Sequence, residues 1–162
     1  MTIALGIDPG TATTGYGFVR IEPDGSLIAI NYGVILTPKE ATASARLVML
    51  YNQLHELINT YHPEIAAVEK LFFSKNVTTA LAVGQARGVV MLCLEQSGIE
   101  AFEYTPNEVK QAVAGYGGAQ KRQVQEMVRA LLALDSIPKP DDAADALAIA
   151  ITHLSTKRYD LV

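Results

Sequence analysis

Two short apolar runs in the first half of the chain each end in a carboxylate. Residues 3–8 (IALGID) stop at Asp8, directly before Pro-Gly, and residues 65–69 (IAAVE) stop at Glu69. Apolar runs of this length that end at turn or polar residues predict buried strands. In α/β proteins, ligand chemistry gathers at the ends of such strands. Asp8 and Glu69 are therefore candidate site residues, although an acid before Pro-Gly is also an ordinary turn former.

The rest of the sequence predicts an α/β fold in which a β-hairpin extends the sheet. Residues 14–21 and 26–36 are rich in β-forming side chains and flank a turn, Glu-Pro-Asp-Gly, at 22–25. Helices and a further strand are expected at residues 43–60 (helix), 76–97 (helix), 99–104 (strand), 106–113 (helix), 121–134 (helix) and 141–155 (helix). A hairpin combined with helix-connected strands predicts a mixed sheet.

Length and composition favour a single domain over residues 1–162, with residues 156–162 as a short tail. The chain has 162 residues, of which 49% are hydrophobic, enough to bury one sizeable core. A single cysteine excludes a disulfide framework and a cysteine-rich zinc site, and it suits a reducing cytoplasm. The N-terminus does not have the pattern of a secretory signal, and uninterrupted apolar runs such as 88–94 are too short to cross a membrane.

The helix expected at 76–97 is apolar on every side. Leucine and valine surround its axis, interleaved with alanine and glycine, which predicts a helix buried on more than one face. One face has its own sheet to cover it. A second copy of the chain is the natural cover for the other face, so the sequence predicts a homodimer.

Three aspartates open the last expected helix. Asp141, directly after Pro140, is interpreted as a helix cap, the ordinary role of an acid in a first turn. Asp142 and Asp145 share one flank of a helix that is otherwise apolar. Asp145 lies beyond the cap, where an unpaired carboxylate would be costly. The apolar remainder of the helix should carry these acids toward the sheet.

Acids that converge on one place repel each other unless a positive charge lies between them. No lysine or arginine lies within five residues of Asp8, so a divalent cation is the better candidate. Carboxylate oxygens suit Mg²⁺, and zinc is disfavoured because no histidine or cysteine lies near these acids in the sequence. Two such ions about 4 Å apart can activate water and stabilise a leaving oxygen. The residues therefore favour a metal-dependent phosphoryl-transfer enzyme.

Five segments resemble one known family, in the same order along the chain. They are GIDPG at 6–10, GYG at 15–17, VEKLFFSKN at 68–76, GQARG at 84–88 and DAADALAIAITH at 142–153. The chain resembles the RuvC family of bacterial Holliday-junction resolvases, within the retroviral-integrase/RNase H-like superfamily. The resemblance implies an RNase H-like fold, with a mixed five-stranded sheet and helices on both faces.

The resemblance also implies a site and an activity. The family's four catalytic and metal-binding carboxylates match Asp8, Glu69, Asp142 and Asp145, which would hold two Mg²⁺ ions, with Mn²⁺ as a substitute. The implied enzyme is a homodimer that makes paired symmetric nicks in four-way junction DNA near a TT step, leaving 5′-phosphate and 3′-hydroxyl ends. It would act in the bacterial cytoplasm, at the nucleoid during repair, with the RuvA/RuvB branch-migration complex.

Aromatic and basic residues around these acids are candidate DNA contacts. The family match favours stacking of Phe72 on a base, whereas Phe73 is equally suited to the core. Two windows without any acid, 70–94 and 109–125, hold basic residues that fit phosphate contacts as well as ordinary solvated positions. These residues are Lys70, Lys75, Arg87, Lys110, Lys121 and Arg122.

The formal net charge of −4 weighs against a nucleic-acid partner only if the charges are spread evenly. Five of the 17 acids belong to the expected metal site or border it, which leaves 12 acids against 13 basic residues. Three other functions stay open. GIDPGTATTG also resembles the phosphate turn of sugar kinases and actin-like ATPases, though those need two lobes. A non-catalytic junction-binding module and a single-strand or RNA nuclease of the same fold are the others.

Overall fold

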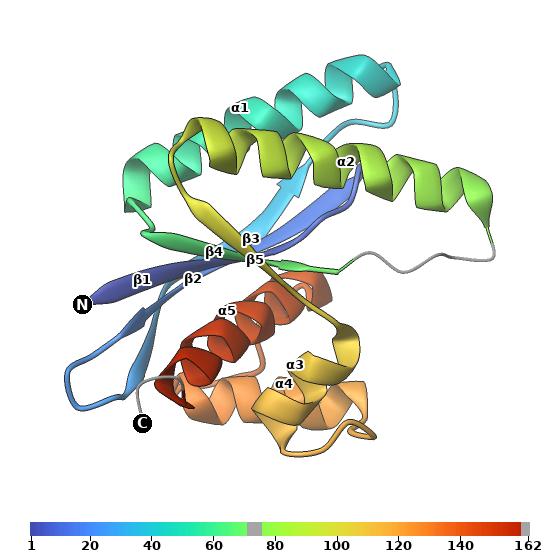
Figure 1. Cartoon of the computed structure of the whole chain (residues 1–162). Helices are drawn as coiled ribbons and strands as arrows, with labels where there is room; N and C mark the ends of the chain where they lie inside the picture. Colours follow the sequence, from blue (N-terminus) through green and yellow to red (C-terminus); the bar gives the residue numbers. More distant parts are fainter. Residues whose placement is uncertain (71–75, 160–162) are drawn as a thin grey trace.

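The computed structural model describes residues 1–70 and 76–159, without the side chains of 158 and 159. The strands are β1 (Thr2–Asp8), β2 (Thr13–Ile21), β3 (Leu27–Leu36), β4 (Ile65–Glu69) and β5 (Glu100–Tyr104). The helices are α1 (Ala43–Tyr61), α2 (Val77–Gln96), α3 (Pro106–Ala114), α4 (Lys121–Leu131) and α5 (Asp141–Tyr159) (Figure 1). The predicted strands and helices are all confirmed, with small shifts at their ends.

The five strands form one mixed sheet in the order β3-β2-β1-β4-β5. β1, β2 and β3 are antiparallel neighbours, as the predicted hairpin requires, and β4 and β5 run parallel to β1. The register places Asp8 opposite Gly15 on β2, and Ile7 opposite Val68 on β4. Asp8 and Glu69 therefore end neighbouring strands at the same level of the sheet.

Helices cover the sheet on both faces, as predicted. α1 and α2 lie on one face, and α5 lies against the other with α3 and α4 outside it (Figure 1). Each face has its own cluster of buried side chains. Leu50, Leu54 and Val90 belong to the cluster under α1 and α2, and Leu147 and Ile151 to the cluster around α5.

Local sequence explains where most of the helices begin. The side chains of Thr42, Asn76 and Thr105 accept hydrogen bonds from the backbone N–H groups three residues later, which caps α1, α2 and α3. Pro106 then follows as the first residue of α3, where a missing N–H has no cost. α4 begins with a capping box formed by Gln120 and Gln123, in which the Gln123 side chain accepts a 2.8 Å hydrogen bond from the backbone N–H of Gln120.

The two last helices end elsewhere than the sequence predicts. α4 stops at Leu131 rather than residue 134, because Ala133 adopts a left-handed conformation (φ 52°) that reverses the chain. α5 continues to Tyr159, so residues 156–159 are helical and the predicted tail over 156–162 is wrong there. Lys157 lies 5.0 Å from the centre of the Phe102 ring on β5, a cation–π contact that favours the added turn. Residues 160–162 lie outside the described residues.

Within this chain α2 is buried on one face only, so burial of its other face against a second copy of the chain stays a prediction. Ala86, Val90 and Leu94 face the core, whereas Leu81 is 64% exposed and Leu92 52% exposed. By length and composition alone, α2 is also apolar enough to cross a membrane, with a mean hydropathy of 1.5. In the fold it packs on α1 and β5 as part of a helical layer.

Candidate metal centre and nucleic-acid interface

α5 brings its acids to the sheet because two glycines let its backbone approach β1 and β2. A Cβ atom added at Gly6 would lie 1.9 Å from the carbonyl oxygen of Ala146. One added at Gly15 would lie 2.0 Å from the carbonyl oxygen of Asp142. Because no other residue fits at either position, the first turn of α5 rests beside the end of β1.

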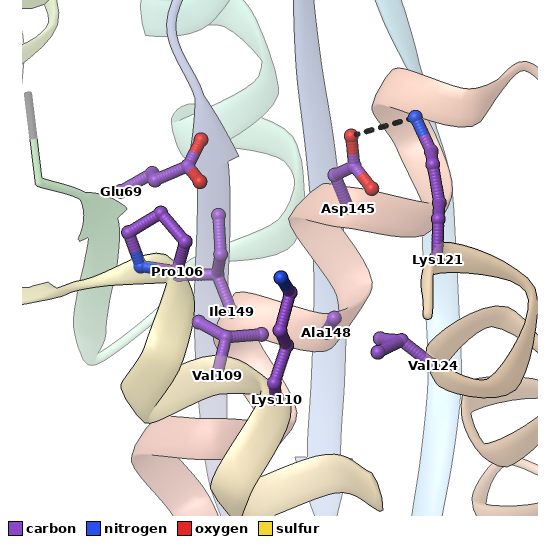
Figure 2. Close-up of a pocket in the computed structure, with 9 residues that line it drawn as sticks. All are labelled: Glu69, Pro106, Val109, Lys110, Lys121, Val124, Asp145, Ala148 and Ile149. Atoms are coloured by element: carbon purple, nitrogen blue, oxygen red, sulfur yellow. Dashed lines mark ion pairs between the residues drawn. The ribbon is translucent and has the colours of Figure 1, made fainter. Parts of the chain in front are cut away.

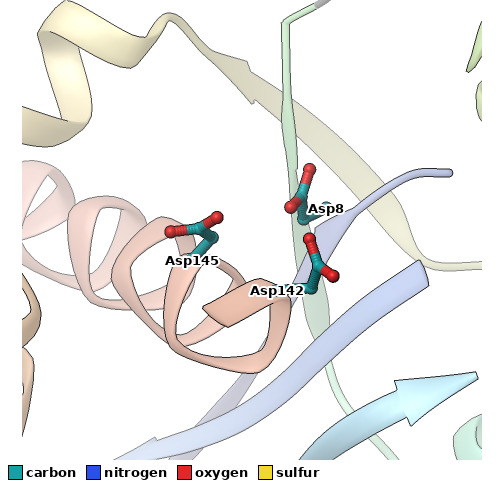
Figure 3. A group of neighbouring side chains, drawn as sticks. All are labelled: Asp8, Asp142 and Asp145. Carbon is teal, nitrogen blue, oxygen red and sulfur yellow. The ribbon is translucent and has the colours of Figure 1, made fainter. Parts of the chain in front are cut away.

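Three carboxylates meet where β1 ends and α5 begins. One oxygen from each of Asp8, Asp142 and Asp145 lies within 4.8 Å of the other two (Figure 3). All three side chains are half-buried. Glu69 adjoins them from β4, where its carboxyl group shares a hydrogen bond with that of Asp8. The structure thus brings together the four acids named from the sequence.

The protonation of these acids reflects their crowding. Burial raises the pKa of Asp8 to about 8, with further contributions from the Glu69 charge, the hydrogen bond to Glu69, and the other aspartates. Burial also raises the pKa of Asp145 to about 6, although Lys121 opposes this shift. Without a cation, Asp8 therefore holds a proton at neutral pH.

The donor set fits a hard divalent cation. Asp8, Asp142 and Asp145 offer only carboxylate oxygens, the ligands that Mg²⁺ prefers. Among the described residues, no basic side chain forms an ion pair with Asp8 or Asp142. A bound cation would replace the proton on Asp8 and remove the repulsion that raises its pKa.

Lys121, which the sequence predicted as a phosphate contact near the acids, also forms ion pairs with two of them. Its ammonium nitrogen lies 3.3 Å from Asp141 Oδ2 and 3.8 Å from Asp145 Oδ2, reaching them from the start of α4. Burial alone would lower the pKa of Lys121, but the nearby aspartates raise it. The sequence around Asp8 gives no sign of these ion pairs, because α4 reaches the cluster only through the tertiary fold.

The interpretation of Asp141 as a helix cap is wrong. Asp141 is the first helical residue of α5, and the carbonyl oxygen of Pro140 accepts the first helical N–H bonds, from Ala143 and Ala144. The Asp141 carboxylate turns toward α4, where it pairs with Lys121 and accepts a 3.3 Å hydrogen bond from Gln125 Nε2.

A cavity of about 290 Å³ adjoins the carboxylates on the α3–α4 side (Figure 2). Glu69 and Asp145 stand at its polar rim, together with Lys110 and Lys121. Its apolar lining consists of Pro106, Val109, Val124, Ala148 and Ile149. Two of the predicted phosphate contacts, Lys110 and Lys121, therefore lie beside the acids.

A second cavity, of about 300 Å³, lies on the α2 side of the same acids. Asp8 and Glu69 line it together with Lys70 and Arg87, which the sequence also named. Arg87 is not free there, because its guanidinium pairs with Glu103 on β5. Its Nε atom is buried without a partner among the described residues. Arg87 is thus fixed toward the site by a strand that sequence spacing did not connect with it.

Of the other predicted DNA contacts, only Arg122 is among the described residues, and it lines neither of the two cavities beside the carboxylates. Arg122 is exposed and pairs with Glu126 at 3.4 Å, one turn along α4. Phe72, Phe73 and Lys75 lie outside the described residues, between β4 and α2.

The sheet and its acids define a class of protein. An antiparallel β1-β2-β3 unit extended by parallel β4 and β5, with carboxylates from β1, β4 and α5 at one end, is an RNase H-like fold with an acidic site. The family model described as "Crossover junction endodeoxyribonuclease RuvC" matches residues 4–153. The chain belongs to this family, as the sequence motifs indicated.

Individual relatives agree with the family model. A Roseiflexus sp. (strain RS-1) protein named Crossover junction endodeoxyribonuclease RuvC is 60% identical over 152 residues, covering 94% of this chain and 90% of its own. A solved structure of Thermus thermophilus RuvC superposes with a TM-score of 0.91 at 36% identity, covering 98% and 97% of the two chains. T. thermophilus RuvC in complex with Holliday junction substrate gives 0.89 at 34% identity, covering 98% and 96%.

Proposed function

We propose that this chain is a crossover-junction endodeoxyribonuclease that cuts four-way junction DNA with Mg²⁺. The observation that carries the proposal is the meeting of Asp8, Asp142 and Asp145 within 4.8 Å on a chain of this family. The relative T. thermophilus RuvC, which has the same fold, has been solved in complex with Holliday junction substrate.

The four acids would hold two Mg²⁺ ions, for which Mn²⁺ can substitute. Bound there, the metal would activate water and stabilise the leaving oxygen of a phosphodiester, with 5′-phosphate and 3′-hydroxyl products. Asp8 gives up its proton on metal binding, because only the carboxylate is a ligand. Glu69 would close the site from β4, and before metal binds its hydrogen bond with protonated Asp8 holds the two carboxyl groups together.

Basic side chains on both sides of the acids would bind the DNA backbone. Lys110 and Lys121 line the cavity on one side, and Lys70 and Arg87 line the cavity on the other. A strand that crosses the acids would meet a positive charge before and after the cleaved phosphate. We also propose contacts for three predicted residues outside the described part and for one on α4: Phe72, Phe73, Lys75 and Arg122.

A homodimer would supply the two equivalent cuts that a junction requires. The exposed apolar face of α2, with Leu81 and Leu92, fits a two-fold interface with a second copy. We further propose that residues 1–162 form one nuclease domain that prefers a TT step. It would work in the bacterial cytoplasm, at the nucleoid during repair, with RuvA/RuvB.

Mapping the cuts on a synthetic mobile four-way junction, with and without Mg²⁺, tests the proposal. The expected result is a pair of nicks at symmetric positions in two strands of like polarity, seen only with the ion. Linear duplex, single-stranded DNA and RNA of the same sequence serve as controls and should stay intact. Cleavage without Mg²⁺, or equal cleavage of single strands or RNA, would contradict it.

A further inference from the structure

A basic hollow lies beside α4; of the residues that line it, only Arg122 has been given a role so far. Its volume is about 610 Å³, and it is enclosed by α4, the segment that leads into α5, and β3. We call it the α4 hollow; its polar lining is Tyr32, Arg122, Glu126, Arg129, Ser136 and Lys139. Three of these six side chains are basic, and one is acidic.

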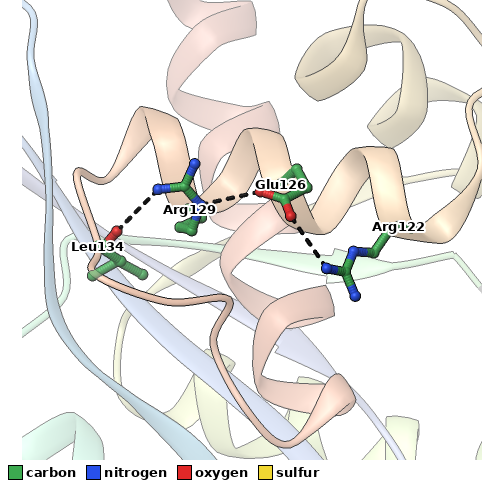
Figure 4. Close-up of polar contacts among 4 residues, drawn as sticks. All are labelled: Arg122, Glu126, Arg129 and Leu134. Carbon is green, nitrogen blue, oxygen red and sulfur yellow. Dashed lines mark hydrogen bonds and ion pairs between the residues drawn. The ribbon is translucent and has the colours of Figure 1, made fainter.

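The single acid of the α4 hollow is shared between its two arginines. Glu126 accepts from Arg122 at 3.4 Å with one oxygen and from Arg129 at 3.1 Å with the other (Figure 4). Arg129 also donates to the carbonyl oxygen of Leu134 at 3.5 Å, which holds it beside the segment that leads into α5. Two guanidinium charges against one carboxylate leave a net positive charge.

Lys139 adds a further charge from the opposite wall. Among the described residues it forms no ion pair, and its side chain is exposed. The hydroxyl groups of Ser136 and Tyr32 line the same space and can donate hydrogen bonds. Together these groups match the donors that bind phosphate oxygens of a nucleic-acid backbone.

The α4 hollow lies close to the carboxylates along the sheet. Asp8 pairs with Gly15, Gly15 pairs with Val34 on β3, and Tyr32 is two residues from Val34. Two strand spacings and two residues of rise separate the Cα atoms of Asp8 and Tyr32 by roughly 12 Å. Because successive nucleotides advance about 3.4 Å along a duplex, this distance spans about three to four nucleotides. Lys121, which pairs with Asp145 at the metal site, is the chain neighbour of Arg122, which lines the hollow.

We infer that the α4 hollow binds DNA backbone phosphates three to four nucleotides from the cleaved bond. The inference rests on the proposed function, since it places a second part of the same substrate. Arg129, Lys139 and Ser136 are then DNA-contacting residues that lie outside both acid-free windows of the sequence. Their role is to hold the strand, so that the phosphate at the metal site stays aligned for cleavage.

The first test is the salt dependence of junction binding, measured in Ca²⁺ so that binding is separated from cutting. Each lost phosphate contact lowers the slope of log K against log salt by about 0.9. Lys139→Gln should lower the slope by about this amount and weaken binding about three- to tenfold at moderate salt. Glu126→Gln should tighten binding, because it removes the competing acid. Lys157→Gln, at the far end of α5, is the matched control and should leave the slope unchanged.

The second test places the contact on the DNA. A neutral methylphosphonate three or four nucleotides from the cut should weaken binding by the wild type and add no further loss for Lys139→Gln. If Lys139→Gln leaves the slope unchanged and Glu126→Gln binds the junction more weakly than the wild type, the inference is overturned. An acidic protein partner would then be favoured for the α4 hollow. If the wild type itself neither binds nor cuts the junction, the proposed function fails instead.

Discussion

The two long helices on opposite faces of the sheet, α2 and α5, are both rich in apolar residues but have different surroundings. α5 is buried along most of its length, from Ala143 to Leu154, against β1 and β2. α2 is buried along one stripe, which includes Ala86 and Val90, and leaves Leu81 exposed. The difference in burial comes from the sheet, where Gly6 and Gly15 allow the backbone of α5 to approach closely.

Apolar residues serve a different purpose in each helix. Close packing of α5 on the sheet places Asp142 and Asp145 at the end of β1, beside Asp8. Because α2 is only partly buried, it leaves an exposed apolar face that could pack against a second copy of the chain. We therefore propose that the layer around α5 carries the chemistry and that the exposed face of α2 forms the dimer.

Gly15→Ala should disrupt the tightly packed layer, with the largest effect among the substitutions that test packing. The new Cβ would overlap the carbonyl oxygen of Asp142, so α5 must shift away from the sheet. A misplacement of about 1 Å costs roughly a hundredfold in rate, and overpacking costs about 1–3 kcal/mol of stability. Junction cleavage and thermal unfolding measure the two effects. Unchanged cleavage would show that close seating of α5 is not required.

Leu81→Glu should break the loosely packed layer. Burying a leucine contributes about 1.5–3 kcal/mol, and a two-fold interface contains it twice, so the dimer should weaken by about a hundredfold or more. Analytical ultracentrifugation measures this, with circular dichroism to check the fold. Leu131→Glu, 39% exposed on α4, is the control and should leave the dimer intact. Equal dissociation by both variants, or by neither, would contradict the assignment of α2.

The stability of the metal-free protein should fall as pH rises toward 8. Asp8 has its pKa raised to about 8, so between about pH 4 and 8 the folded state holds a proton that the unfolded state has released. Asp8→Asn removes this loss and should be more stable than the wild type at pH 8 in EDTA, by about 1–3 kcal/mol after solvent screening. Thermal unfolding between pH 5 and 9 tests it. If the wild type instead gains stability relative to Asp8→Asn as the pH rises from 5 to 9, the raised pKa of Asp8 is contradicted.

Gly88→Ala should have the smallest effect and sharpen the comparison between glycines. Gly88 lies within α2, and a Cβ there meets nothing within 4 Å. Alanine in place of glycine in a helix should stabilise the chain by about 0.5–1 kcal/mol. Thermal unfolding measures the change, and a loss of stability as large as that of Gly15→Ala would contradict it.

The sequence predicted most of the fold because hydrophobic period and turn residues act locally. Asp8 and Glu69 could be placed together, since both end strands that pack into one sheet. The pairing of Lys121 with Asp145 could not be predicted, because it depends on how α4 lies against α5. For the same reason, the contact between Arg87 and Glu103 carries no local signal.

Glycine and arginine spacing held more information than the sequence reasoning used. Gly6 and Gly15 occur within the family motifs, yet only the fold reveals that both make room for α5. Arg122 and Arg129 are seven residues apart and therefore share one side of α4, a spacing that could have indicated the α4 hollow.

The central claim is that one carboxylate cluster holds the metal that cuts the junction. The most direct measurement compares cleavage of a four-way junction across Mg²⁺ concentrations by the wild type and Asp145→Asn. We expect Asp145→Asn to cut about 100- to 1000-fold more slowly with junction binding preserved, since a metal ion contributes several kcal/mol. Asp24→Asn, in the turn at the opposite end of β2, should cut normally because Asn can still accept the bond from Ser26. Normal cleavage by Asp145→Asn would contradict the claim.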